Sequence, residues 1–137
     1  MYLEHKVNKD SKQNQIQNMR NIGYNEGYFD VQLEIFPKDS ELFTAYIEGL
    51  KLGVKDGLKA KYENLLEYNM KREKYIHKMG YLSKINKHKL NYKKLSSTDK
   101  KIFMNGVSDA YNYLLNMTFK DFQDMKEGKQ YQRTKNK

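Results

Sequence analysis

Residues 23–53 read GYNEGYFDVQLEIFPKDSELFTAYIEGLKLG, and the spacing of small and aromatic residues in this stretch recurs 57 positions further along the chain. The matching features are Gly23-Tyr24 with Gly80-Tyr81, Ser40 with Ser97, Tyr46 with Phe103, Gly49 with Gly106, and Gly53 with Ala110. Repeats are sought first because a missed repeat misassigns the whole fold. A constant offset without gaps favours an internal duplication. The alternative is chance recurrence of short glycine patterns in a Tyr-rich helical chain.

The chain is predicted to be all-α, because it has a single proline, Pro37, and little alternation of β-branched residues. A first helix from about residue 11 should end before Pro37, since proline disfavours the α conformation in the residue before it. Lys38-Asp39-Ser40-Glu41 offers an N-cap and an acidic first turn for a second helix. A third helix is predicted over residues 70–85. Ser96-Ser97-Thr98-Asp99 begins a fourth helix, and Thr118-x-x-Asp121 predicts a short last one.

Small residues recur at four-residue intervals on the predicted helices, and we expect them at helix–helix contacts. Residues four apart share one helix face, and each glycine costs a helix about 0.5–1 kcal/mol relative to alanine. Close approach of two backbones is the compensation that such stripes provide. The alternative is a flexible or kinked segment at residues 53–57. The predicted packing residues are Gly23, Gly27, Gly49, Gly53, Gly106 and Ala110.

These patterns predict two tandem helix–loop–helix repeats packed as one small helical domain. The boundaries place a flexible N-terminus at residues 1–10, one helical-hairpin repeat at 11–66, a second at 67–127 and a basic, disordered tail at 128–137. Large apolar side chains between the repeats form either core or a homodimer face; they are Tyr62, Leu65, Leu66, Tyr68 and Met70. Whether the second helix continues into the third is left open.

Positive charge is concentrated in the second half of the chain. Residues 1–70 contain nine Lys or Arg and eleven Asp or Glu, a net charge of −2, whereas residues 71–137 contain seventeen and six, a net charge of +11. This asymmetry favours either a half that faces a polyanion or a merely solubilising basic region. There is no cysteine, so disulfides and thiolate metal sites are excluded, which suits a reducing compartment. Without a membrane-length apolar stretch, the protein is predicted to be soluble and cytoplasmic.

The strongest functional signal is the segment 71–101, which holds eleven Lys or Arg with tyrosines interleaved. Lysines gain affinity for phosphate backbones by releasing counterions, and exposed tyrosines stack on unpaired bases. The alternative is a solvated lysine face over core tyrosines. The predicted nucleic-acid-binding residues are Lys71, Arg72, Lys74, Lys78, Lys84, Lys87, Lys89, Tyr92, Lys93 and Lys94.

The first copy of the repeat resembles the ribosome modulation factor family. The similarity rests on Gly23-Tyr24-Asn25-Glu26-Gly27, Pro37 and Tyr46-Ile47-Glu48-Gly49, and covers residues 20–55 and, more faintly, 77–112. The family's tryptophans and basic flanks are missing from this copy. The resemblance implies a helical-hairpin architecture and binding to RNA and protein of the small ribosomal subunit, where the family silences ribosomes.

Sequence patterns therefore favour a small, non-catalytic regulator that binds RNA, DNA or the ribosome through its second half. The alternative is a protein–protein interaction module, such as a phage or mobile-element inhibitor of a host or phage factor. No P-loop, zinc knuckle or clustered His and carboxylate pattern is present in the sequence, so we expect no enzyme activity, no metal and no cofactor.

Overall fold

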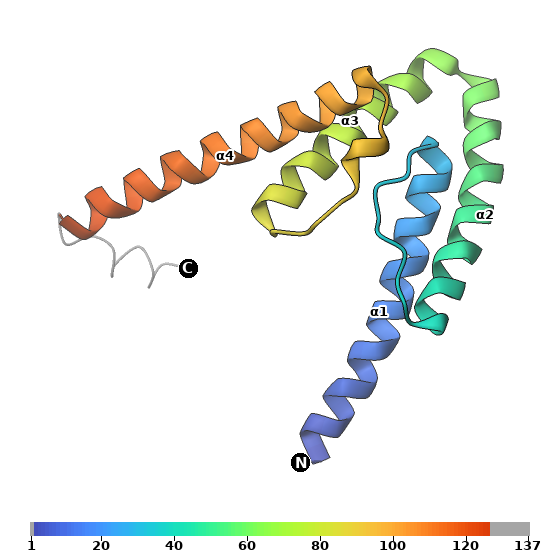
Figure 1. Ribbon diagram of the computed structural model, residues 1–137, viewed down its shortest axis with the longest axis horizontal. Coiled ribbons are helices and arrows are strands. Elements are labelled where there is room, and N and C mark those ends of the chain that lie inside the picture. The colour runs from blue at the N-terminus through green and yellow to red at the C-terminus, as the bar shows by residue number, and fades with distance from the viewer. Residues whose placement is uncertain (1, 127–137) are drawn as a thin grey trace.

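The computed structural model describes residues 2–126 and is all-helical in that range (Figure 1). The helices are α1 (Tyr2–Phe29), α2 (Ser40–Glu63), α3 (Leu65–Ile85) and α4 (Ser97–Lys126), with a short 3-10 helix, η1 (Tyr92–Lys94), before α4. The packed pairs are α1 with α2 and α3 with α4, which are the two predicted helix–loop–helix units. The predicted tail at 128–137 lies outside the described residues.

The two helices of each unit run parallel, which an ordinary αα-hairpin does not do. Along α2, Gly49, Gly53 and Gly57 successively face the backbones of Arg20, Tyr24 and Tyr28 on α1. The loop at residues 30–39 must therefore return along the helix before α2 begins, as the pale blue trace shows (Figure 1). Ten extended residues reach about 33 Å, enough to run back along four turns of helix, which span about 22 Å.

Glycines bring the paired backbones into direct contact. A Cβ added at Gly23 or Gly49 would lie 2.1 or 2.0 Å from a carbonyl oxygen of the opposite helix. The equivalent distances are 2.0 Å at Gly80 and 2.1 Å at Gly106, and they run to the carbonyls of Phe103 and His77, each 57 residues beyond its counterpart. The stripes therefore serve close packing, and α2 continues through residues 53–57 without a break.

The loops of the two units also begin alike. Asp30 and Lys87, which follow the first helix of each unit, both adopt a left-handed backbone, with φ of 51° and 54°. The N–H of the next residue donates to the carbonyl five residues earlier, at 3.0 Å in both units. This geometry closes the open C-terminal turn of a helix.

The second helices of both units begin with an equivalent N-cap. The side chain of Asp39 accepts hydrogen bonds from the N–H groups of Glu41 and Leu42. The hydroxyl of Ser96 accepts one from Asp99 N–H at 3.2 Å. The caps predicted from the sequence are confirmed, and with the paired glycines they confirm two tandem repeats at an offset of 57 residues.

Three boundaries differ from expectation. Helix α1 already begins at Tyr2 and includes most of the N-terminal segment predicted to be flexible, a segment that contains neither Gly nor Pro. Helix α4 continues to Lys126, so no separate last helix starts at Thr118, whose hydroxyl donates to Leu114 C=O within the helix. Helix α3 begins at Leu65 rather than near residue 70, because a single residue, Asn64, caps the end of α2 and the start of α3.

The core lies where the two units meet. Leu33 from the first loop and Leu90 from the second are buried beside Ile76 of α3 and Phe103 of α4. Asn91 N–H donates to Leu33 C=O at 2.6 Å, which fastens one loop to the other. Because residues from both loops fill this core, each unit depends on the other for burial of its apolar side chains.

Candidate functional site

The predicted basic segment, residues 71–101, comprises part of α3, the connector and the start of α4. The connector, residues 86–96, returns along α3 to the start of α4. Lys87, Lys89, Lys93 and Lys94 are exposed on it. Among the residues described by the structure, none of these four lysines has an acidic group within ion-pair distance. Their ammonium groups are therefore available to an anionic partner.

The remaining lysines of the predicted set lie on α3. Lys74 and Lys78 are exposed and four residues apart, so they share a face of this helix. Lys71 pairs with Glu67 at 3.0 Å within the helix. Lys84 lies with its ammonium 5.5 Å from the centre of the Tyr111 ring on α4, a cation–π contact.

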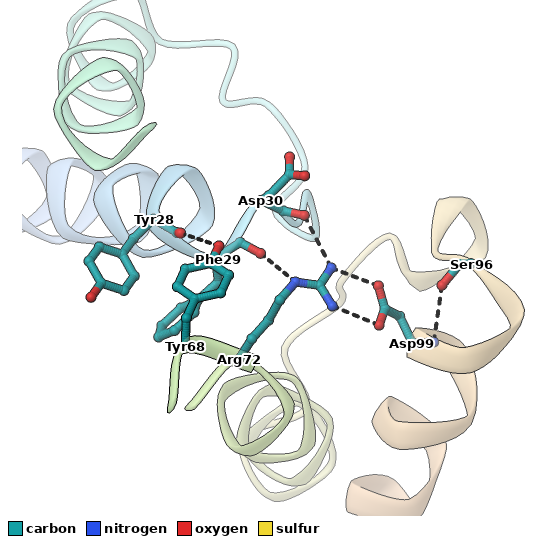
Figure 2. A network of polar contacts seen from close by, with 7 residues as sticks. All are labelled: Tyr28, Phe29, Asp30, Tyr68, Arg72, Ser96 and Asp99. Carbon is teal, nitrogen blue, oxygen red and sulfur yellow. Dashed lines mark hydrogen bonds and ion pairs between the residues drawn. The ribbon is translucent and has the colours of Figure 1, made fainter. Parts of the chain in front are cut away.

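Arg72 differs from the other predicted residues because its guanidinium is engaged inside the protein (Figure 2). Its Nε donates to Phe29 C=O at 2.6 Å, and a terminal nitrogen donates to Asp30 C=O at 3.2 Å. Both terminal nitrogens donate to the Asp99 carboxylate, at 2.9 and 2.7 Å. One residue of α3 thus joins the end of α1 to the start of α4. This pairing holds the pKa of Asp99 below its ordinary value.

The tyrosines of the basic segment are used in packing. Tyr75 stacks on Phe29 at 4.9 Å between ring centroids, and Tyr92 stacks on Phe103 at 5.3 Å. Tyr81 is half-buried and lies 6.5 Å from the ring of Tyr113. Since these rings already contact aromatic neighbours, the lysines offer more to a ligand than the tyrosines do.

An open cleft of 520 Å³ lies under the connector, and the sequence analysis did not find it. Its surface is mostly aliphatic and aromatic, from Ile35, Leu90, Phe103, Met104 and Val107. Lys84, His88, Lys89 and Lys93 also line it. No Asp or Glu is among the lining residues within 2–126, so the lining combines apolar side chains with positive charge.

Glu26 is a second feature to which the sequence analysis gave no role of its own. It is 1 % exposed, and its carboxylate accepts hydrogen bonds from Leu33 N–H at 3.1 Å, Glu34 N–H at 2.7 Å and the Tyr46 hydroxyl. Burial raises the pKa of this carboxyl group. Glu26 fixes the first loop against both helices of its unit, and its presence in the Gly-Tyr-x-Glu-Gly motif gives that motif a structural role.

Of the apolar residues expected in a core or a dimer face, Tyr68 is buried and its hydroxyl donates to Tyr28 C=O at 2.6 Å. Tyr62, Leu65, Leu66 and Met70 are exposed around the α2–α3 junction. The homodimer face therefore stays a prediction. In the described part of the chain, no helix is both long and apolar enough to cross a lipid bilayer.

Comparison with protein families, with curated proteins and with solved structures finds no match to this chain. The resemblance to the ribosome modulation factor family consequently remains a prediction from short motifs.

Proposed function

We propose that this protein is a non-catalytic regulator that binds nucleic acid, free or within a ribosome, through the connector and the adjoining face of α3. The observation that carries the proposal is the row of exposed lysines on the connector, Lys87, Lys89, Lys93 and Lys94, without acidic partners in the described part of the chain. Such lysines release counterions from a phosphate backbone, which drives binding without sequence specificity.

The position of the lysines suits this role. Leu90 anchors the connector in the core while the four lysines beside it are exposed, so a phosphate backbone can contact the lysines without disturbing the core. Arg72 is not part of the proposed binding surface, because its guanidinium already pairs with Phe29, Asp30 and Asp99. Lys74 and Lys78 extend the positive surface along α3.

The test compares two fourfold variants in binding to a mixed-sequence oligonucleotide across a salt series. One changes Lys87, Lys89, Lys93 and Lys94 to Gln, and the other changes the exposed lysines Lys38, Lys51, Lys55 and Lys59 of the first unit to Gln. Both remove the same charge. We expect only the connector variant to lose affinity, with a salt slope lowered by about 0.7–0.9 for each lysine that contacts a phosphate. The proposal would be refuted if the wild type did not bind the oligonucleotide at about 50 mM salt, or if both variants lost the same affinity.

A protein partner is the second candidate, and the apolar cleft is the observation that favours it. Nucleic-acid backbones offer phosphates to lysines but nothing to an aliphatic surface. The cleft is lined by both kinds of group.

A further inference from the structure

Each repeat contains a cleft at the equivalent position, and the two clefts differ in volume and charge. Subtracting 57 from Ser83, Lys84, Lys89, Phe103 and Val107 gives residues that line a cavity of 290 Å³ in the first unit. That cavity is little more than half the volume of the second. Its lining includes Glu26 and Asp30 and, within the described residues, no Lys or Arg. The second copy has thus become both larger and cationic.

Smaller side chains at three lining positions contribute to the larger volume. Glu26, Tyr46 and Leu50 of the first unit correspond to the smaller Ser83, Phe103 and Val107. A glycine contact has also been lost. A Cβ at Gly27 would lie 2.3 Å from Leu50 C=O. The counterpart of Gly27 is Lys84, which has a Cβ, so α3 and α4 must stand farther apart at this level than α1 and α2.

The positive charge around the cleft exceeds what one small anion needs. Lys84, Lys89 and Lys93 line it, and Lys87 and Lys94 lie beside it in the chain. Glu34 is not among the lining residues, and its carboxylate lies 3.1 Å from Nε2 of His88, which is. A ligand that matches this surface carries several negative charges.

The chemistry of the cleft wall distinguishes between the two classes of polyanion, a nucleic acid and an acidic protein segment. Ile35 and Met104 are 56 % and 41 % exposed and present aliphatic surface. Among the described lining residues, the polar side chains other than lysines are those of Ser83, His88, Asn91 and Tyr92. A nucleobase inserted against this aliphatic wall would bury polar atoms of its edge without hydrogen-bond partners, which is unfavourable. A Phe or Leu side chain needs none and gains by leaving water.

We propose that this cleft docks an acidic segment of a partner protein, which inserts one aromatic or large aliphatic side chain between Ile35, Met104 and Val107 while its carboxylates pair with Lys84, Lys89 and Lys93. The proposal goes beyond nucleic-acid binding. Because Lys89 and Lys93 belong to both surfaces, the acidic segment and a nucleic acid exclude each other.

The probe is a short, fluorescein-labelled synthetic peptide of Glu and Ser with one central Phe, compared with the same peptide carrying Ala in place of Phe. Binding to the full-length protein is measured by fluorescence anisotropy. We expect the Phe peptide to bind at least about tenfold more tightly, because its ring is buried in the cleft. Equal affinity for the two peptides overturns the proposal.

Two pairs of variants localise the site. Met104→Trp fills the cleft, and Met117→Trp is its control, since both methionines lie on α4 and are 41 % exposed. Only Met104→Trp should remove the advantage of the Phe peptide. Lys89→Glu with Lys93→Glu should weaken both peptides, whereas Lys55→Glu with Lys59→Glu on α2 should not. An unchanged advantage in Met104→Trp refutes the cleft as the docking site, provided that its thermal melt matches wild type.

The same samples separate the two proposals. Unlabelled mixed-sequence oligonucleotide should displace the Phe peptide from wild type, and simultaneous binding of both would overturn mutual exclusion. Oligonucleotide binding that survives in Met104→Trp, with the peptide lost, supports both proposals. Peptide binding without oligonucleotide binding supports the cleft and refutes the proposed function.

Discussion

At the scale of single residues, the buried Glu26 and the half-buried Arg72 replace contacts that a larger core would supply. Glu26 satisfies two backbone N–H groups at the point where the first loop turns back, and Arg72 satisfies carbonyls at the end of α1. A buried donor or acceptor left without its partner costs about 1–3 kcal/mol. Both side chains therefore stabilise the fold through the backbone groups that they complete.

Glu26→Ala should lower the free energy of unfolding by about 2–4 kcal/mol, because the N–H of the buried Leu33, the Glu34 N–H and the Tyr46 hydroxyl lose their acceptor. Glu26→Gln keeps an acceptor oxygen for the loop and should cost less. Urea denaturation checks the order. If Glu26→Ala is as stable as Glu26→Gln, the carboxylate is not what holds the loop.

Glu26 also gives stability a pH dependence of known sign. Its pKa is raised in the folded protein, so between the unfolded and folded values the folded state binds more protons than the unfolded state. Stability must then fall as pH rises through this interval, which begins near the ordinary value for Glu, about 4.3. Relative to Glu26→Gln, the wild type should lose stability from this pH upward and then level off. A constant difference between pH 4 and 8 would contradict the assignment.

Arg72→Ala should destabilise by about 3 kcal/mol, because it removes the guanidinium partner of the Asp99 carboxylate and of two carbonyls in a site where the two side chains are 22 % and 14 % exposed. Arg72→Lys should recover little, since one ammonium cannot form the same fork. In a double-mutant cycle with Asp99→Ala, the coupling should disappear at low pH, because the lowered pKa of Asp99 makes its contribution vanish as pH falls through the folded value. Additive losses at neutral pH would contradict the pairing.

At the scale of elements, the parallel pairs depend on backbone contact at glycines. Gly53 and Ala110 are equivalent positions, and both are buried. A Cβ at Gly53 would lie 2.1 Å from Tyr24 C=O. The second unit already accommodates a Cβ at this place, which indicates that α3 and α4 are spaced more widely there than α1 and α2.

Gly53→Ala should therefore destabilise by about 1–3 kcal/mol through forced separation of α1 and α2, although alanine is the better helix former. Ala110→Gly should cost about 1 kcal/mol, mainly through helix propensity. Thermal melts of the two variants provide the comparison. A Gly53→Ala variant that melts above wild type would show that α1 and α2 move apart without strain.

The sequence was sufficient for most of the elements but not for their direction. Caps at Asp39 and Ser96, the proline and the glycine spacing predict where helices begin and which faces pack. The spacing of residues identifies the face on which a helix packs but not the relative direction of two packed helices. The parallel course of α1 and α2 could therefore not be predicted. It follows from the extended return loop, in which Val31 and Leu33 alternate into the core.

At the scale of the whole molecule, the copies have diverged according to their neighbours. Phe29 and Val31 of the first unit contact the second unit in the shared core, and the corresponding Asn86 and His88 are exposed. Terminal repeats need such a polar outer face. The exposed positions on either side of the buried Leu90 could accumulate lysines without a cost to the core.

The candidate site was only partly predictable for the same reason. A count of lysines along the chain identifies the connector, because exposed charge is visible in the sequence. It also includes Arg72, whose partners Phe29 and Asp99 lie 43 and 27 residues away. The cleft arises from the small side chains of Ser83 and Val107 beside Ile35 of the other unit, a juxtaposition that only the packing of the two units creates.

The one-residue junction at Asn64 has a consequence for assembly. Its amide side chain caps α3 at Glu67 N–H, and its N–H still closes the last turn of α2. If this residue became helical, Ser40 to Ile85 would form one rod about 69 Å long. The second unit could then no longer reach the first unit of its own chain. The vacated contacts, with the Arg72 fork among them, would be completed reciprocally by another molecule, which is three-dimensional domain swapping.

Asn64→Ala removes the cap and raises helix propensity, so we expect it to yield a larger fraction of swapped dimer than wild type. Asn64→Asp keeps a capping oxygen and should not. Light scattering after size-exclusion chromatography measures the fraction. Identical profiles for Asn64→Ala and wild type would mean that the bend is fixed by the core rather than by its single hinge residue.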